Sequence, residues 1–139
     1  MEGPSLSFKL ESSESRTHKH KVYSEVYIYR KDAGLLKLDK ASIESEIETR
    51  PLYAKGSSKI VKIVARPGDY ILYFWLVRNF RREVKGYISV FSHRGELLYR
   101  AKYVNGILRY SMGNKLYSWL VRVLVDQVKL PVKKFEEGV

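Results

Sequence analysis

Hydrophobic and polar positions alternate through residues 85–111 in a pattern that predicts three antiparallel strands. Two turn signals set their register: Arg94-Gly95, and Asn105-Gly106, the dipeptide most typical of type I′ hairpins. Counting outward from these turns gives four directly opposed pairs: Tyr87 with Lys102, Ser89 with Arg100, Phe91 with Leu98, and Lys102 with Arg109.

Directly opposed residues share a face of a sheet, so both faces of this segment can be assigned. One face is basic and aromatic and consists of Lys85, Tyr87, Phe91, Arg100, Lys102 and Arg109. The other has the composition of a side packed on a core and consists of Ile88, Val90, Leu97, Tyr99, Ala101, Tyr103, Leu108 and Tyr110. A slip of one residue would bury the cations, so the register is strongly specified.

A second hairpin is predicted over residues 59–66 and 69–78, around Pro67-Gly68, which suits a type II turn. Its apolar side opposes Ala65, Ile63 and Val61 to Tyr70, Leu72 and Phe74, and its other side opposes Lys62 to Tyr73 and Ile60 to Trp75. If the apolar faces of all strands stay together, Tyr73 and Trp75 join the basic aromatic face. The following loop carries Arg81 and Arg82, which we expect at the rim of the same groove.

The first half of the chain has weaker signals. Residues 1–20 are polar and are expected to be flexible. Residues 21–31 alternate as a strand, whose aliphatic side (Val22, Ser24, Val26 and Ile28) is the better candidate for the core, and a turn at 31–34 leads to a short strand at 35–38. Residues 39–50 fit either a helix capped by Asp39 or a strand; we favour the helix, ended by Pro51.

The last element is a predicted helix over residues 115–129, capped by Asn114 and stopped before Pro131. It is apolar on nearly every side, so we expect it to be buried almost all round. The predicted fold class is therefore α+β: a curved antiparallel sheet of about six to seven hairpin-connected strands, packed on this mostly apolar C-terminal helix. We expect one domain over residues 21–131, followed by a short charged tail at 132–139.

Composition agrees with a single globular domain. With 139 residues, of which 45% are hydrophobic, the chain can bury a core without disulfides, and it contains no cysteine. The longest apolar run, residues 70–77, is too short to span a membrane, and no signal peptide is visible, so a cytoplasmic location and no membrane partner are expected. The abundance of Lys, Arg, Tyr, Val and Ile resembles that of thermophile proteins.

The formal net charge of +11 is unevenly distributed. Residues 78–109 hold eight Lys and Arg against two Glu, so more than half of the excess lies on predicted strands and their loop. Cations that bind phosphates, beside aromatic rings that stack on unpaired bases, favour single-stranded DNA or RNA as the partner. The candidate binding residues are Lys62, Tyr73, Trp75, Arg81, Arg82, Lys85, Tyr87, Phe91, Arg100, Lys102 and Arg109.

In element order alone, several antiparallel strands followed by a helix, the chain is similar in outline to single-stranded-DNA-binding proteins of the positive cofactor 4 and Whirly type. No motif residue of those families is matched, so no residue role is carried over from them.

Two other functions remain open. Asp69 and Glu83-Val84-Lys85 loosely resemble the PD-(D/E)xK pattern of metal-dependent nucleases, which would imply a divalent cation held by the two carboxylates. A structural or assembly subunit is the other alternative, with a homodimer formed through the C-terminal helix or a sheet edge. The preferred interpretation is a non-enzymatic nucleic-acid-binding protein that needs no cofactor and no metal.

Overall fold

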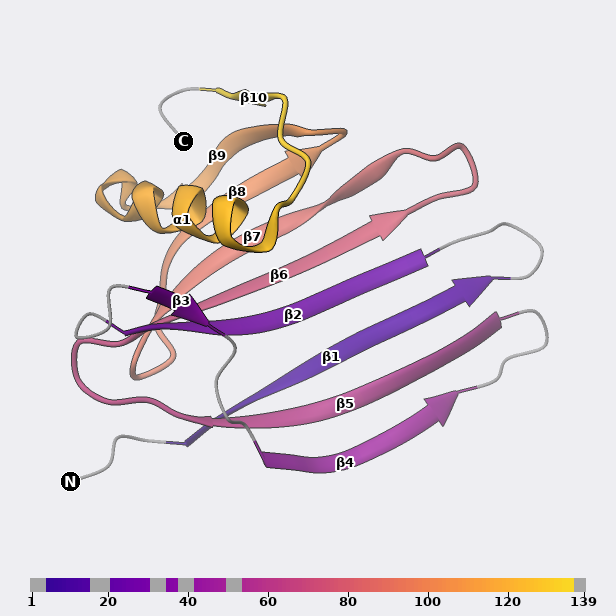
Figure 1. Cartoon of the computed structure of the whole chain (residues 1–139), viewed down its shortest axis with the longest axis horizontal. Coiled ribbons are helices and arrows are strands. Elements are labelled where there is room, and N and C mark those ends of the chain that lie inside the picture. Colours follow the sequence, from indigo (N-terminus) through magenta and orange to yellow (C-terminus); the bar gives the residue numbers. More distant parts are fainter. Residues whose placement is uncertain (1–4, 16–20, 31–34, 38–41, 50–53, 137–139) are drawn as a thin grey trace.

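The computed structural model describes the fold of residues 5–15, 21–30, 35–37, 42–49 and 54–136, and the side chains of residues 6–10, 21–30 and 60–136. The fold is α+β: a mostly antiparallel open sheet with one C-terminal helix (Figure 1). The elements are β1 (Ser5–Ser15), β2 (Lys21–Arg30), β3 (Leu35–Lys37), β4 (Ser42–Thr49), β5 (Ala54–Val64), β6 (Tyr70–Arg78), β7 (Val84–Ser92), β8 (Leu97–Val104), β9 (Ile107–Gly113), the 3-10 turn η1 (Lys115–Tyr117), α1 (Ser118–Val128) and β10 (Lys134–Phe135).

The strand order is β10-β9-β8-β7-β6-β2-β1-β5-β4, with β3 paired to β2 beside this path. The described residues thus form ten strands, more than the six or seven expected. Two of the additional strands come from segments predicted otherwise: β1 lies in the supposedly flexible N-terminal segment, and β4 replaces the favoured helix at residues 39–50. In both segments, pairing with β5 provides the backbone hydrogen bonds. Local sequence propensity does not predict such long-range pairing. The turn predicted at 31–34 and the helix end predicted at Pro51 lie outside the described residues. The other internal or N-terminal residues outside the description are 1–4, 16–20, 38–41, 50, 52 and 53.

The predicted register of β7, β8 and β9 is confirmed over most of its length. Tyr87 pairs with Lys102, Ser89 with Arg100, and Lys102 with Arg109. The predicted pairing of Phe91 with Leu98 is wrong, because Phe91 pairs with Leu97. The loop runs from Ser92 to Glu96, and a bulge after Val90 leaves Leu98 as the additional residue on β8. As a result Leu98, and not the expected Leu97, packs against the core.

The predicted pairing of the two strands on either side of Pro67-Gly68 is wrong. A tight turn does form, since the Asp69 amide donates to the Arg66 carbonyl oxygen at 2.9 Å and Gly68 has a φ of 92°. However, β5 pairs with β1 and β4, whereas β6 pairs with β2 and β7. Lys62 therefore does not oppose Tyr73, nor Ile60 Trp75, because both edges of β6 are taken by other strands.

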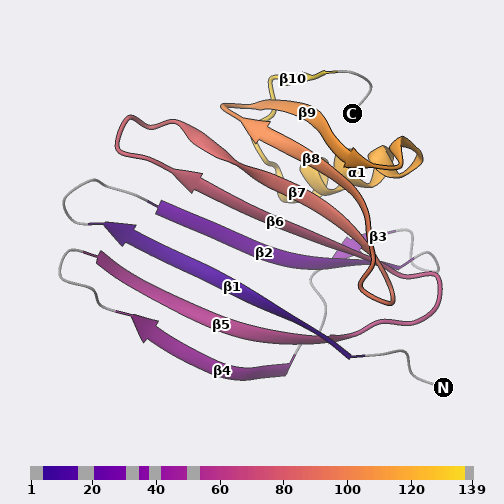
Figure 2. The ribbon, with the colours of Figure 1, turned by 180° about the vertical axis from the view of Figure 1, so that it is seen from behind.

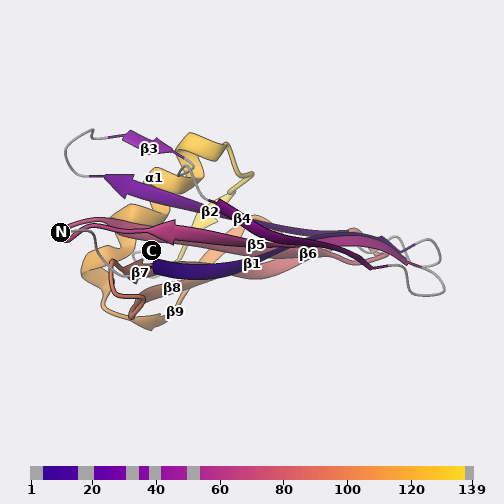
Figure 3. The same cartoon turned by 90° about the horizontal axis from the view of Figure 1, so that it is seen from below.

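Instead, β1 and β5 pack beneath β2 and β6 as a second layer at one end of the sheet. β1 pairs with β2 only through Ser12–Glu14, and away from these residues the two strands diverge (Figure 3). Between the layers lies the interlayer core, whose buried members are Val26, Ile28, Val61, Ile63, Ala65 and Ile71. The aliphatic side of β2 is thus buried, as predicted, but under a layer that the sequence did not indicate.

The opposite face of the sheet carries α1 (Figure 1). Asn114 caps η1 as predicted, its side chain accepting from the Leu116 amide at 2.9 Å, and α1 ends at Lys129 in a left-handed conformation with a φ of 55°. Leu120, Val121, Leu124 and Val125 of α1 are buried in the helix-side core, together with Leu72, Phe74, Leu76, Ile88, Val90, Tyr99, Ala101, Tyr103 and Leu108. The helix is not buried all round, because Trp119 is 43% exposed.

The segment after α1, which includes the first residues of the predicted charged tail at 132–139, is attached to the sheet. The Tyr103 hydroxyl donates to the Pro131 carbonyl oxygen at 2.6 Å, and the Lys133 amide donates to the Gly106 carbonyl oxygen at 2.6 Å. Beyond these contacts β10 pairs in parallel with β9, and Glu136 forms an ion pair with Arg109. Residues 137–139 lie outside the described part of the chain.

Loss of the hydroxyl group should affect the free energy of unfolding differently at the two buried tyrosines of β8. Among the described residues the Tyr99 hydroxyl has no hydrogen-bond partner, and burial raises the pKa of Tyr99 to about 12. Tyr99→Phe is expected to leave the free energy of unfolding unchanged or to raise it by up to about 1 kcal/mol, because an unsatisfied polar group is removed. Tyr103→Phe should lower it by about 1 kcal/mol, because the bond to Pro131 is lost. Urea denaturation of both variants measures the difference, and equal losses would contradict these assignments.

Candidate nucleic-acid interface

The face of the sheet away from α1 carries a hollow of about 370 Å³ over β6, β7 and β8. Figure 2 shows this face, with α1 behind the sheet. The cross-strand pairs Trp75 with Tyr87 and Tyr73 with Ser89 supply most of its floor. The lining residues are Tyr73, Trp75, Tyr87, Ser89, Phe91 and Arg100. The structure thus brings five of the predicted site residues into one place, including Tyr73 and Trp75, whose position depended on the faces staying together.

Arg100 is held in the hollow by two contacts. Its Nε donates to the Ser89 Oγ at 3.0 Å, and its guanidinium carbon lies 5.4 Å from the centre of the Tyr87 ring. Ser89 is 4% exposed, so the hydroxyl that anchors the guanidinium is itself fixed by its surroundings. Tyr87 is 40% exposed and leaves part of its ring open to a ligand. Arg100 and Tyr87 therefore hold a cation and an aromatic surface in a fixed relative position.

β1 packs against two of the residues that line the hollow. The Phe8 ring lies 5.6 Å from that of Tyr73 and 5.7 Å from that of Phe91, measured between ring centres. The Tyr73 hydroxyl also donates to the Lys9 carbonyl oxygen at 3.3 Å. Tyr73 and Phe91 are thus tied to the second layer, whereas the Tyr87 ring is in contact with Arg100.

Three cations extend this face beyond the hollow. Lys85 and Lys102 are exposed and share the face of Tyr87, and within the described part of the chain neither forms an ion pair. Arg109 lies opposite Lys102, but its Nε is 2.7 Å from the Glu136 Oε2. A phosphate at Arg109 would have to compete with that carboxylate, so Lys85, Arg100 and Lys102 carry most of the available positive charge.

The other predicted cations lie elsewhere. Lys62 is exposed on β5 and alternates with Val61 and Ile63, which point into the interlayer core, so its side chain is on the outer side of the second layer. Arg81 and Arg82 are held in a loop organised by Asn79, whose Oδ1 accepts from the amides of Arg81 at 2.9 Å and Glu83 at 3.0 Å. Arg82 lines hollows with Phe80 and with Pro131, and neither arginine lines the hollow of Tyr87.

The residues of the nuclease-like pattern are not brought together. Asp69 precedes β6 and is 8% exposed, and its Oδ2 accepts from the Arg66 amide at 2.9 Å within the tight turn. Glu83 follows β6 and accepts from the Asn79 side chain at 3.2 Å. The nine residues of β6 separate them by roughly 25–30 Å. These two carboxylates cannot hold one metal ion.

The sequence prediction missed one residue that lines the hollow, Ser89, and one that packs against its lining, Phe8. Ser89 was placed opposite Arg100 but was not recognised as its anchor, although its position between Tyr87 and Phe91 on the same face was a usable signal. Phe8 was assigned to a flexible segment, although Leu6, Phe8 and Leu10 alternate with Ser7 and Lys9 as in a half-buried strand.

No protein-family model, curated protein or solved structure matches this chain. In the described part of the chain no helix has the length and apolar character needed to cross a membrane.

Close approach of β6 and β7 at Gly86 sets the position of Tyr87. A Cβ atom at Gly86 would lie 1.9 Å from the Trp75 carbonyl oxygen and 2.9 Å from the Leu76 Cα, so the two strands would have to separate. Gly86→Ala is expected to lower the free energy of unfolding by about 1–3 kcal/mol. Thermal or urea unfolding tests this expectation. Gly68→Ala is a useful comparison, because no atom lies within 4 Å of a Cβ there and the cost is confined to its positive φ; an equal effect at both sites would contradict the steric account.

Proposed function

We propose that this protein binds single-stranded DNA or RNA on the face formed by Trp75, Tyr87, Arg100 and Lys102. The observation that carries the proposal is the fixed pairing of Arg100 with the half-open Tyr87 ring inside a hollow lined by Trp75. A base can stack on the aromatic surface while its phosphate meets Arg100 or Lys102. Each stacked base contributes about 1–3 kcal/mol.

The arrangement favours unpaired over paired nucleic acid for a geometric reason. The aromatic rings lie in a hollow next to the packed Phe8 ring of β1, where a base can enter only if it is splayed from its neighbours. In a duplex the bases are stacked on one another and their faces are not available. The cations on the same face attract the backbone without selecting a sequence.

Removing the ring of Tyr87 should weaken binding more than it weakens the fold. Tyr87→Ala is expected to raise the Kd for a labelled single-stranded oligonucleotide by about 5- to 150-fold, the equivalent of one lost stacking interaction. Fluorescence anisotropy measures the change, and circular dichroism checks that the variant is folded. An unchanged Kd in a folded Tyr87→Ala protein would contradict the proposed surface.

The cations of the face should determine the salt dependence. In the double variant Arg100→Ala with Lys102→Ala, the slope of log Kd against log salt concentration should be shallower by about 1–2. Titrations at several salt concentrations give this slope. Lys62→Ala is the matched control, because it removes one exposed cation from the outer side of the second layer and should leave the slope nearly unchanged. Equal slopes in wild type and double variant would refute the assignment.

Assembly through the start of the helix is a second candidate function. Leu116 is 77% exposed and Trp119 43% exposed, and both lie within the continuous run of η1 and α1. Large exposed apolar side chains close together favour contact with another protein surface. A second copy of the chain is the partner proposed, and the like charge of two such chains should make their association stronger, not weaker, as salt is added.

Mass measurement by light scattering tests this assembly. The wild-type mass should rise with protein concentration in the absence of nucleic acid, and Leu116→Asp should hold it at the monomer value. Phe80→Asp is the control, because Phe80 is 55% exposed on a different loop and its replacement should not alter the mass. A monomeric wild type at all concentrations would remove this candidate.

A further inference from the structure

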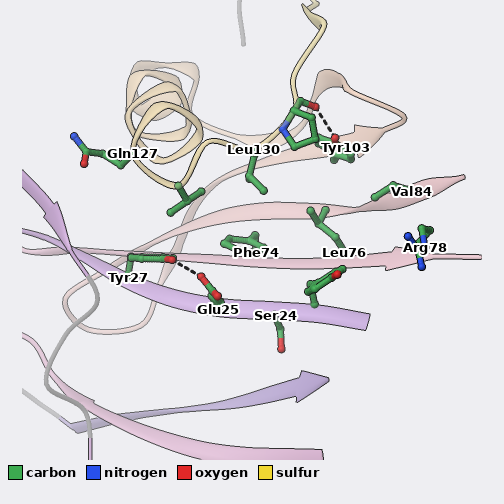
Figure 4. A pocket seen from close by; sticks show the side chains of 13 residues that line it. Ser24, Glu25, Tyr27, Phe74, Leu76, Arg78, Val84, Tyr103, Gln127 and Leu130 are labelled. Atoms are coloured by element: carbon green, nitrogen blue, oxygen red, sulfur yellow. Dashed lines mark hydrogen bonds between the residues drawn. The ribbon is translucent and has the colours of Figure 1, made fainter. Parts of the chain in front are cut away.

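On the helix side of the sheet, opposite the proposed nucleic-acid surface, a groove of about 720 Å³ runs between β2, β6 and the segment that follows α1. Its floor is apolar and contains Phe74 and Leu76, and Leu130 lies on a wall above them (Figure 4). Pro131 lines the same wall. This volume is within the range of small-molecule binding sites. The shape is that of a site for one small molecule with a mainly apolar body.

The wall of this groove is fixed by hydrogen bonds. The Tyr103 hydroxyl donates to the Pro131 carbonyl oxygen at 2.6 Å (Figure 4). The Leu130 amide donates to the Val125 carbonyl oxygen at 3.1 Å. Further along the chain, the Lys133 amide is bound to the Gly106 carbonyl oxygen. The segment is therefore anchored on both sides of Pro131 and cannot readily collapse onto Phe74 and Leu76. The groove is formed before any ligand arrives, which lowers the cost of binding.

Charge differs along the groove. At one end lies Arg78, directly opposite Lys21 across the pairing of β2 with β6, so two cations share one place on the same face. Lys21 Nζ also lies 4.8 Å from the centre of the Tyr23 ring, another lining residue. Away from Arg78, Glu25, which pairs directly with Phe74 across β2 and β6, accepts a hydrogen bond from the Tyr27 hydroxyl (Figure 4). Opposed like charges are destabilising, and an anion at Arg78 would relieve their repulsion.

We propose that this groove binds an amphiphilic small molecule with an apolar body and one anionic end, with the body over Phe74 and Leu76 and the anion at Arg78 and Lys21. The carboxylate of Glu25, four residues along β2 from Lys21, fixes the direction, because it repels the anionic end. The site is separate from the surface proposed for nucleic acid, since the two lie on opposite faces of the sheet. Whether this groove binds a small molecule therefore does not depend on whether the protein binds nucleic acid.

The test uses decanoate, with decanol as the neutral ligand of matched length, both below the concentrations at which they aggregate. Isothermal titration calorimetry should show saturable binding of both ligands to the wild-type protein, with decanoate the tighter. Arg78→Gln should raise the Kd of decanoate about tenfold and leave that of decanol unchanged. Leu130→Trp fills the groove and should raise the Kd values of both decanoate and decanol at least tenfold.

Arg100→Gln is the matched control, because it removes an arginine from the other face and should change neither Kd. Equal weakening of decanoate by Arg78→Gln and Arg100→Gln would overturn the proposal, since it would indicate attraction to net charge alone. Binding that is unaffected by Leu130→Trp, or no saturable binding by the wild type, would overturn it as well. If Arg78→Gln does not fold, Lys21→Gln replaces it with the same expected selectivity for decanoate.

Discussion

The pairing register of β6, β7 and β8 determines the properties of both faces of this protein. Because side chains alternate along a strand, the pairs Trp75 with Tyr87 and Tyr87 with Lys102 place rings and cations together on one side. The same register places Ile88 and Tyr99 under α1 on the other. A shift of one residue would bury the cations and expose the helix-side core, so core and charged surface reinforce a single pairing.

The two faces are then covered to different extents, and each uncovered part is a candidate site. On one side the β1 and β5 layer covers the sheet as far as Phe91 and leaves the hollow of Tyr87 and Arg100 open. On the other, α1 and the segment through Pro131 leave a groove above Phe74. In both cases the sheet forms the floor, and an element packed on the sheet lies next to the open part. The apolar groove and the basic hollow therefore suit different ligands.

Local signals in the sequence predicted most of the register of β7, β8 and β9, but they did not predict how the strands before β6 pair. Turn residues and strict alternation defined β7, β8 and β9, and Asn114 marked the start of the helical run. The pairing of β5 was not accessible in this way, because a Pro-Gly turn joins strands in either of two arrangements, as neighbours in one ladder or as members of two packed layers. The choice depends on β1 and β2, which compete for the edges of β5 and β6 from far along the chain. The same competition moved Lys62 from the predicted site to the outer surface.

Fluorescence of Trp75 tests the central claim most directly. The chain contains two tryptophans, so a Trp119→Phe protein reports on Trp75 in the floor of the hollow. Adding single-stranded oligonucleotide should quench this emission in a saturable way, with the same midpoint as binding measured by anisotropy, because a base stacks beside the indole. Duplex DNA of the same length should quench it far less. Tight binding of single strands with no change in Trp75 emission would show that nucleic acid lies elsewhere on the protein and would contradict the account.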